Sequence, residues 1–271
     1  MDIEELEKLR KKLRNINLCG ALVIFLIMVL CNFLLEPIIC VPVMLVVISI
    51  GAMVIVAMES TLTTKFNLEY KNKFVLGALK STFDEYEYLP EEGISSEVIK
   101  SAQFIGKHYE SKDYITVVYN KIQAYYSYIY TYERGYEDRV DILFKGRYFI
   151  FYSNNFSNKN IQVFSKIYYS HNTGKAVELE FYERFHVHCD ENTDTSDIIT
   201  LGLMNLLIGL DEKYRGRVSC CFVGNKIHLR ISEHKNPFEP CIYRKIDEEK
   251  TNIKFLEEIE IMKNFIDEVS K

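Results

Sequence analysis

The apolar positions of the chain form one long run near the N-terminus, followed by shorter periodic patterns. Residues 18–58 contain a single charged residue, Glu36, which Pro37 follows near the midpoint of the run. A helix needs roughly 20 residues to cross a bilayer, so the run is too long for one span and suits two, 18–35 and 38–58. A carboxylate is tolerated at a membrane surface, and proline disfavours helix in the residue before it. The pattern therefore predicts a transmembrane helical hairpin with Glu36-Pro37 at its tip.

Glu36 leaves a second interpretation open. One long helix could bury Glu36 against a partner, or the segment could re-enter the membrane, because membrane helices tolerate prolines such as Pro42. Two separate spans explain the length of the run better.

The charges that flank the run predict its orientation. Basic residues precede the first span and follow the second, whereas the tip has no Lys or Arg. They are Lys8, Arg10, Lys11, Lys12 and Arg14 before the run, and Lys65, Lys71 and Lys73 after it. Because basic flanks stay on the cytoplasmic side, both termini are expected in the cytoplasm, and the lipid bilayer is the first predicted partner. No small-residue cleavage site ends a short apolar region, so the hairpin is expected to remain attached.

Helical periodicity flanks the hairpin on both sides. In residues 1–17 the apolar side chains are spaced by three and four positions, at Leu6, Leu9, Leu13 and Ile16. This predicts an amphipathic cytoplasmic lead-in helix that lies on the membrane surface or against a partner. Alternatively, the segment is a solvated lead-in that supplies positive charge. Residues 59–89 are predicted as a juxtamembrane helix that continues from the second span.

From residue 90 the apolar spacing is mainly two, which is typical of strands with one buried face. Strands are predicted at 113–132, 138–153, 161–170 and 177–190, and a hairpin at 217–232 around Gly224 and Asn225. Helices are predicted from Ser95 or Ser96 to Ala102, at 197–214 and at 247–271. Gly146 is interpreted as a hairpin turn or a bulge. The absence of a βαβ rhythm indicates an α+β fold, with residues 90–271 forming a cytoplasmic, mainly antiparallel sheet domain with a few packing helices.

Charge and cysteine content narrow the class of protein. The first 58 residues contain five basic and five acidic side chains, so the whole net charge of −5 lies in the rest of the chain. This mild acidity argues against a nucleic-acid partner, for which a basic stripe is usual. The cysteines after the hairpin, at 189, 220, 221 and 241, form no C-x-x-C pair and are expected to be reduced and structural.

Several short stretches carry a resemblance to a known family. They are the Y-x-P-x-x-G-I stretch at 88–94, the F-K-G stretch at 144–146 and the F-E-P stretch at 238–240. In order and spacing they resemble the bacterial membrane proteins grouped as domain of unknown function 3137, over nearly the whole chain. Residues 193–197 stand where that family tends to carry V-E-A-R-Y, so any role of that Arg is absent here. The resemblance implies a multi-pass protein of the inner membrane with a cytoplasmic α+β domain and no established activity.

The stretch H-V-H-C-D offers a candidate metal site. His186, His188 and Asp190 fall on one face of the predicted strand, and two imidazoles and a carboxylate are suitable metal ligands. His228 and His234 would join them only if the strands pair suitably. The resembling sequences tend to carry an aromatic residue at position 188, which favours two ordinary surface histidines. No cofactor is expected.

Two motif-like stretches offer a candidate binding groove. Its residues would be Tyr88, Pro90, Gly93, Phe238, Glu239 and Pro240. The alternative is structural, because Gly and Pro punctuate turns and the two aromatic side chains can fill a core.

No hydrolase, phosphate-loop or metalloprotease motif is present, so an enzyme is the less favoured class. The sequence predicts a membrane-anchored cytoplasmic binding or scaffolding domain that acts through a protein partner or by self-association. The alternatives are a membrane-associated metal-dependent hydrolase and an accessory subunit of a transporter or channel.

Overall fold

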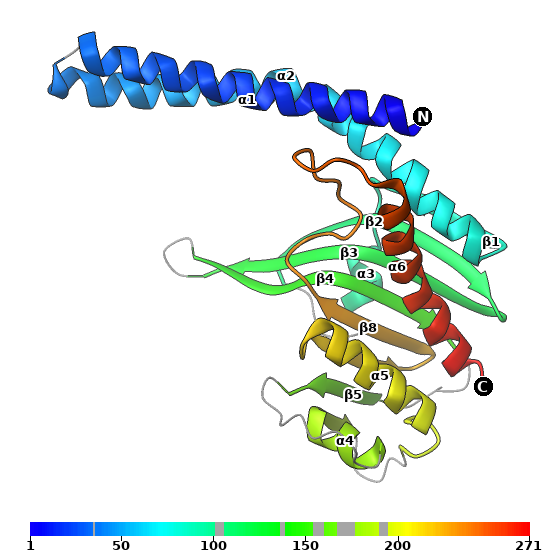
Figure 1. Cartoon of the computed structure of the whole chain (residues 1–271). Helices are drawn as coiled ribbons and strands as arrows, with labels where there is room; N and C mark the ends of the chain where they lie inside the picture. The colour runs from blue at the N-terminus through cyan, green and yellow to red at the C-terminus, as the bar shows by residue number, and fades with distance from the viewer. Residues whose placement is uncertain (35, 101–105, 136–138, 154–159, 167–176, 190–194) are drawn as a thin grey trace. The chain divides into compact units, whose positions relative to one another are not determined.

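The computed structural model describes residues 1–34, 36–100, 106–135, 139–153, 160–166, 177–189 and 195–271 (Figure 1). Two compact units divide the chain. The first combines Met1–Val75 with Glu239–Ile253, and the second combines Leu76–Phe238 with Lys254–Lys271.

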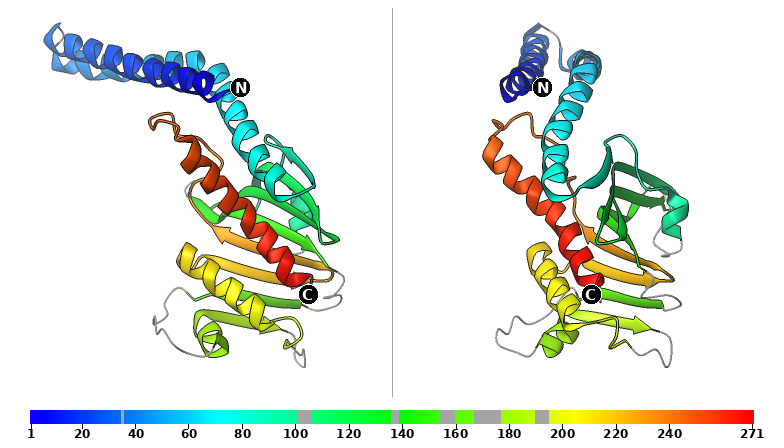
Figure 2. Two further views of the ribbon diagram at one scale, coloured as in Figure 1. Left: turned by 45° about the vertical axis from the view of Figure 1, so that its right-hand side comes forward. Right: turned by 90° about the vertical axis from the view of Figure 1, so that its right-hand side faces the viewer.

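Two long helices, α1 (Ile3–Leu34) and α2 (Pro37–Thr82), account for most of the first unit. Figures 1 and 2 show them running side by side. The second span continues into the juxtamembrane helix, as the periodicity predicted. The lead-in helix and the first span also form one continuous helix, which was not predicted. The carbonyl of Glu36 accepts the amides of Ile39 and Cys40, so the turn between the helices caps α2. Pro37 stands at the first helical position, where a missing N–H costs least.

The apolar stretches of α1 and α2 are almost uncovered by the described chain. Both helices are long and apolar enough to cross a membrane, and the most apolar 18-residue window is 0% buried in α1 and 6% buried in α2. By contrast, Leu6 and Leu13 of the lead-in are fully buried within the first unit. The lead-in stripe therefore packs inside its own unit rather than against lipid.

The second unit contains an antiparallel sheet of eight strands. The strands are β1 (Glu85–Leu89), β2 (His108–Tyr119), β3 (Ile122–Arg134), β4 (Val140–Tyr152), β5 (Asn160–Ser165), β6 (Phe185–Cys189), β7 (Val218–Val223) and β8 (Lys226–Ser232). Their spatial order is β1-β2-β3-β4-β8-β7-β5-β6, and every neighbouring pair is antiparallel. The predicted α+β class is confirmed.

Helices cover the sheet from two sides. They are α3 (Ser96–Lys100), α4 (Val177–Arg184), α5 (Leu201–Tyr214) and α6 (Glu248–Val269), of which α6 belongs to the second unit from Lys254 on. Figures 1 and 2 show α5 and α6 on one face of the sheet, hereafter the helical face, and α3 on the other. On the helical face, Phe151 of β4 stacks on Phe265 of α6 with ring centroids 4.4 Å apart. On the opposite face, Ile99 of α3 shares a buried cluster with Ile129 and Ile150.

The hairpin β7–β8 and the helices α5 and α6 confirm the corresponding sequence predictions. Gly224 has φ +61° in the β7–β8 turn, as a tight hairpin requires. α5 begins after Thr200, whose side chain accepts the amide of Leu203. The described part of the short helix, α3, also agrees with the prediction from Ser95 or Ser96.

Four local predictions were wrong. Residues 113–132 are not one strand, since Asn120 and Lys121, with φ +49° and +63°, turn β2 into β3. Residues 85–89, predicted as helix, form the edge strand β1. Val177–Arg184 is the helix α4, in which Glu180 and Arg184 pair one helical turn apart, and the strand begins at Phe185.

Gly146 is the fourth correction, because it lies inside β4 and makes no turn. It pairs with Ile129 on one side and with Ser232 on the other, at φ +155°. A Cβ at this position would overlap the carbonyl oxygen of Ile231 and lie 2.8 Å from the amide nitrogen of Glu233. Glycine is therefore required by the close approach of β8.

We expect Gly146→Ala to lower the free energy of unfolding by about 2 kcal/mol or more, because the new methyl group must push β4 and β8 apart. Urea unfolding of the full-length protein in mild detergent, followed by circular dichroism, measures the change. Gly209→Ala in α5 is the control, since nothing lies within 4 Å of its Cβ position. There the substitution should stabilise the helix by roughly 0.5–1 kcal/mol. Equal effects at the two positions would contradict the close approach at Gly146.

Candidate functional site

His186 and His188 lie on β6, an edge strand of the sheet. Both side chains are exposed, with ring centroids 6.2 Å apart, and His188 lies 6.2 Å from the ring of Phe164. Asp190, the third candidate ligand, lies outside the described residues. Among the residues that the structure describes, no group of three His, Cys, Asp or Glu side chains could hold a metal ion. The metal site therefore stays a prediction that depends on Asp190.

His228 does not join the two edge histidines. It lies on β8, and β7 and β5 stand between β8 and β6. At roughly 4.8 Å per strand, this separates the elements by about 14 Å. His228 is fully buried, and its Nδ1 forms a hydrogen bond of 2.9 Å with the hydroxyl of Tyr148. Burial, helped by the nearby Lys226 and Arg230, lowers the pKa of His228 to about 4.

The two motif-like stretches meet at one buried carboxylate, Asp113. The hydroxyl of Tyr88 donates to Oδ1 of Asp113 at 2.7 Å, and Nδ2 of Asn236 donates to Oδ2 at 2.5 Å. Oδ1 of Asn236 in turn accepts the amide of Phe238 at 3.0 Å. Asp113 is fully buried in a bulge of β2, with φ +62°. Burial, and then the neighbouring Asp113 charge, raise the pKa of the Tyr88 phenol well above its usual value.

The remaining groove candidates are divided between the units. The carbonyl of Pro90 accepts the amide of Asp113 at 3.1 Å, and a Cβ on Gly93 would overlap Ser111. These contacts fold the turn after β1 onto the bulge of β2. Glu239 is exposed, Pro240 is half-buried, and both belong to the first unit.

Tyr88 and Phe238 therefore have packing roles. Tyr88 is 9% exposed and Phe238 is 1% exposed, and the Phe238 ring lies 5.2 Å from Tyr126 and 5.3 Å from Phe255. The core-filling alternative explains both aromatic side chains. A binding groove at these six positions stays a prediction.

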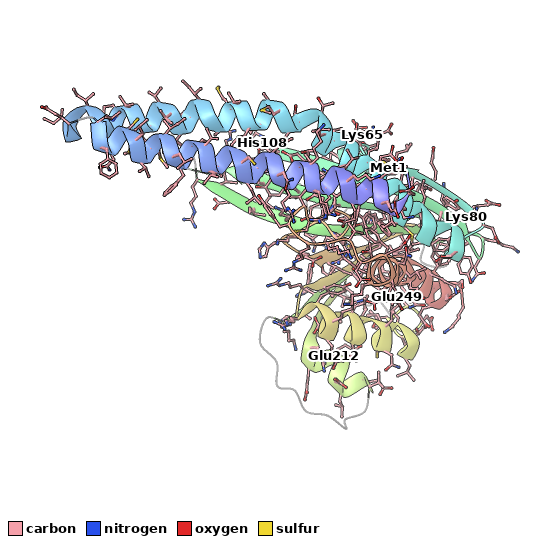
Figure 3. All side chains as sticks on the ribbon, turned by 45° about the horizontal axis from the view of Figure 1, so that its top comes forward. Met1, Lys65, Lys80, His108, Glu212 and Glu249 are labelled. Atoms are coloured by element: carbon pink, nitrogen blue, oxygen red, sulfur yellow. The ribbon has the colours of Figure 1, made fainter. Side chains whose placement is uncertain are left out.

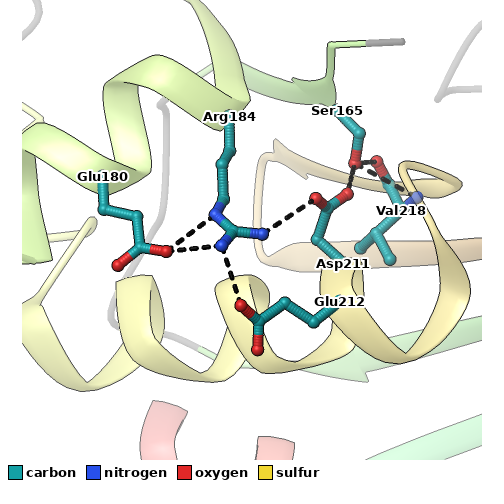
Figure 4. A network of polar contacts seen from close by, with 6 residues as sticks. All are labelled: Ser165, Glu180, Arg184, Asp211, Glu212 and Val218. Atoms are coloured by element: carbon teal, nitrogen blue, oxygen red, sulfur yellow. Dashed lines mark hydrogen bonds and ion pairs between the residues drawn. The ribbon is translucent and has the colours of Figure 1, made fainter. Parts of the chain in front are cut away.

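A second buried polar network joins α4, α5 and β5 (Figure 4). The Arg184 guanidinium contacts Glu180 at 2.9 Å and Glu212 at 2.7 Å, and its Nη1 lies 3.9 Å from the buried carboxylate of Asp211. The Ser165 hydroxyl is hydrogen-bonded to Asp211 and accepts the amide of Val218 at 3.2 Å. This arrangement holds α4 and α5 on the sheet.

In the first unit, a clamp holds the lead-in of α1. Nη1 of Arg10 donates to the carbonyl of Ile242 at 2.7 Å, and Oε1 of Glu7 accepts the amide of Ile246 at 2.6 Å. Arg10 and Glu7 also form an ion pair of 2.9 Å with each other. Although burial opposes it, hydrogen bonding to Arg10 and Ile246 lowers the pKa of Glu7. The covered face of the lead-in thus binds the segment that follows the F-E-P stretch.

A groove with a volume of about 930 Å³ runs along the seam of α1 and α2. Its lining is apolar along the spans and basic at one end. The lining residues are Lys8, Lys11, Lys12, Asn15, Ile16, Cys19, Gly20, Val23, Ile24 and Ile27 of α1, and Val47, Ile50, Gly51, Val54, Ile55 and Met58 of α2. We call this the seam groove. Figure 3 shows the side chains projecting outward along both helices, with Lys65 labelled on α2.

Comparison with protein families decides the class of the C-terminal part. Residues 142–271 match the family described as "Protein of unknown function (DUF3137)". This part of the chain belongs to the DUF3137 family. The match begins in β4 and ends with α6, so it includes the F-K-G and F-E-P stretches and begins after Tyr88. No curated protein and no solved structure matches the chain.

Within the DUF3137 part, sequence reasoning missed two buried arginines that join separate elements, Arg147 and Arg184. Arg147 directly follows the F-K-G stretch, and it pairs with Glu258 of α6 at 2.6 Å while nearly fully buried. Arg184 belongs to a segment that was predicted as strand. A lone charged residue inside an apolar strand run, as at Arg147, is the available signal, because a buried charge requires a partner.

Tyr88→Phe should lower the free energy of unfolding by about 1–3 kcal/mol, since the buried Asp113 carboxylate loses a donor. Thermal and urea unfolding of the full-length protein in detergent measure the loss. Tyr243→Phe is the matched control, because that side chain is 60% exposed, and it should change stability little. Unchanged stability of Tyr88→Phe would contradict the packing role of Tyr88.

The burial of His228 predicts a pH dependence of stability. Its pKa is about 4 in the folded protein and about 6.5 when unfolded, so the unfolded state binds more protons between these values. Stability from this group is therefore present above pH 6.5 and is lost as the pH falls towards 4, with a slope of up to about 1.4 kcal/mol per pH unit. His228→Asn should remove this slope in urea unfolding, whereas the exposed His234→Asn should retain it. Identical slopes for both variants would refute the prediction.

Proposed function

We propose that this protein is a membrane-anchored binding or scaffolding protein of the bacterial inner membrane. In this proposal the α1–α2 hairpin spans the bilayer, both termini are cytoplasmic, and the domain at 90–271 binds a protein partner or a second copy of the chain. The observation that carries it is the uncovered apolar surface of α1 and α2. Phe33 and Ile38 are each 86% exposed, and a continuous apolar surface of this kind is rare on a protein that is surrounded by water.

The position of the charges supports the orientation. The basic residues of the flanks lie at the end of the hairpin from which both the lead-in and the rest of the chain extend, and Glu36 lies at the other end. Basic flanks are retained on the cytoplasmic side. This charge distribution supports a cytoplasmic location of the DUF3137 part.

The polar interior of the domain supports binding over catalysis. In the described part of the chain, the buried groups Asp113, Arg147 and Arg184 contact partners on neighbouring elements. Each of these contacts fixes one element of the domain on another. The hydrolase alternative would need His186 and His188 to converge with carboxylates, and in the described residues such a set is not formed.

Labelling of cysteines tests insertion and orientation. The native Cys241 is exposed in the structure, and Glu36→Cys places a thiol at the hairpin tip. We expect a membrane-impermeant maleimide to label Glu36→Cys in intact spheroplasts and Cys241 only in inverted vesicles, and the protein to stay in the membrane after carbonate extraction. The Cys241→Ser chain is the control for Cys241. Labelling of Cys241 from outside, or release by carbonate, would contradict the anchored topology.

Partner capture tests the binding role. The full-length protein and a version that ends after Val75 are crosslinked in cells and purified from mild detergent. A reproducible partner, or a second copy, should be recovered with the full-length protein alone. Recovery of the same proteins with both versions would show that the domain at 90–271 is not the binding element.

A further inference from the structure

We infer that the seam groove holds one anionic phospholipid, with an acyl chain between α1 and α2 and the phosphate group at Lys8, Lys11 and Lys12. This inference rests on the proposed insertion of the hairpin into a membrane. It goes further because it assigns a bound ligand to a specific groove, beyond the general contact with the bilayer.

The length of the groove fits an acyl chain of one leaflet. Its apolar lining on α1 runs from Ile16 to Ile27, which is a rise of about 17 Å at ~1.5 Å per residue. One leaflet contributes about half of a hydrocarbon core of roughly 30 Å. The volume of about 930 Å³ also lies within the range of ligand sites.

The basic end of the groove fits a phosphate group. Lys8, Lys11 and Lys12 lie on one side of α1, because they are spaced by three and four positions, and all three line the groove. All three side chains are exposed, and in the part of the chain that the structure describes none of them forms an ion pair. Lys12 lies about 9 Å along the helix axis from Leu18, where the span begins. That distance is within reach of a headgroup layer for a long, flexible lysine side chain.

The alternative occupants fit less well. A second copy that packs the same seam in the same orientation would bring its own lysines beside Lys8, Lys11 and Lys12, and like charges at such a contact are unfavourable. A zwitterionic lipid would fill the apolar part but leave these ammonium groups without a net counter-charge. An anionic headgroup satisfies both parts of the groove.

Native mass spectrometry tests the inference with the full-length protein in mild detergent. Equal amounts of phosphatidylglycerol and phosphatidylcholine with the same acyl chains are added, and the ratio of the bound lipids is measured. We expect phosphatidylglycerol to dominate. The triple variant Lys8→Gln, Lys11→Gln, Lys12→Gln should reduce this preference by roughly tenfold or more, since each lysine at a lipid surface favours anionic lipid by about fivefold.

Matched variants separate a specific site from general charge and size effects. The control for charge is Lys65→Gln, Lys80→Gln, Lys235→Gln, which removes three exposed lysines outside the groove and should retain the preference. Val23→Phe with Val54→Phe should fill the groove and lower the binding of both lipids. Val46→Phe with Val56→Phe adds the same volume outside the lining and should leave the binding of both lipids unchanged.

Several outcomes would overturn the inference. The first is equal binding of phosphatidylglycerol and phosphatidylcholine. The second is an equal loss of the lipid preference in the two triple lysine variants. The third is a dimer with a Cys19–Cys19 disulfide, because Cys19 lines the groove and a second copy would then occupy it. If the protein stays in the membrane but shows no preference between the two lipids, this inference is overturned and the proposed function is not. Protein that carbonate releases from the membrane would overturn the proposed function as well.

Discussion

The second unit depends on one buried cation, Arg147. Its guanidinium holds Glu258 of α6 through two contacts of 2.6 and 2.8 Å, pairs with Glu233 at 2.5 Å and lies 4.7 Å from the ring centre of Tyr214. The strand β4, the end of β8 and the helices α5 and α6 therefore converge on a single charge. Burial alone would lower the pKa of Arg147, but Glu258 raises it above its usual value. Because Arg147 stays charged while buried, the fold requires Glu258 and Glu233 to remain beside it.

This pair acts on geometry more than on net stability. A buried ion pair contributes little compared with a well-packed apolar pair, but removing one partner costs about 3–5 kcal/mol, because a charge is left unpaired. Rotation of α6 by one position would bring Glu257 or Ile259 towards β4 and leave Arg147 without its bidentate partner. The pair thus selects one rotation of α6 on the sheet, and the stack of Phe151 on Phe265 then supplies apolar contact in that arrangement.

The parts of the fold that could be predicted are those whose evidence lies within one local window. Three examples could be recognised from neighbouring residues alone. They are the apolar run at 18–58, the apolar stripe of α6 and the turn at Gly224. Val177–Arg184 misled because Val177, Leu179 and Phe181 alternate, yet Leu179 is 63% exposed and Phe181 fully buried, as a helix places them. The turn at Asn120 and Lys121 contains no glycine, so its signal was weak.

The candidate site was harder to predict, because its contacts join segments that are distant in sequence. Tyr88 and Asn236 both look like residues of turns, and only the bulge at Asp113 shows that they share one carboxylate. Gly146 could not be interpreted from the sequence for the same reason, because its role depends on a segment that is distant in sequence. Glycine in a strand indicates a bulge, a turn or a close approach, and the choice among them depends on where β8 lies.

The hairpin follows different physics from the domain. In lipid, apolar surface gives helices no reason to associate, so close van der Waals contact must hold them together. Two reciprocal glycine–isoleucine contacts supply this close packing. The side chain of Ile55 lies so near Gly20 that a Cβ on Gly20 would be 2.6 Å from it, and the side chain of Ile24 lies equally near Gly51. Because each isoleucine fills the space above a glycine, the two backbones approach closely at these two positions. The seam groove is the surface beside that line of contact, so the contacts between the two helices also fix the shape of the groove that we propose as a lipid site.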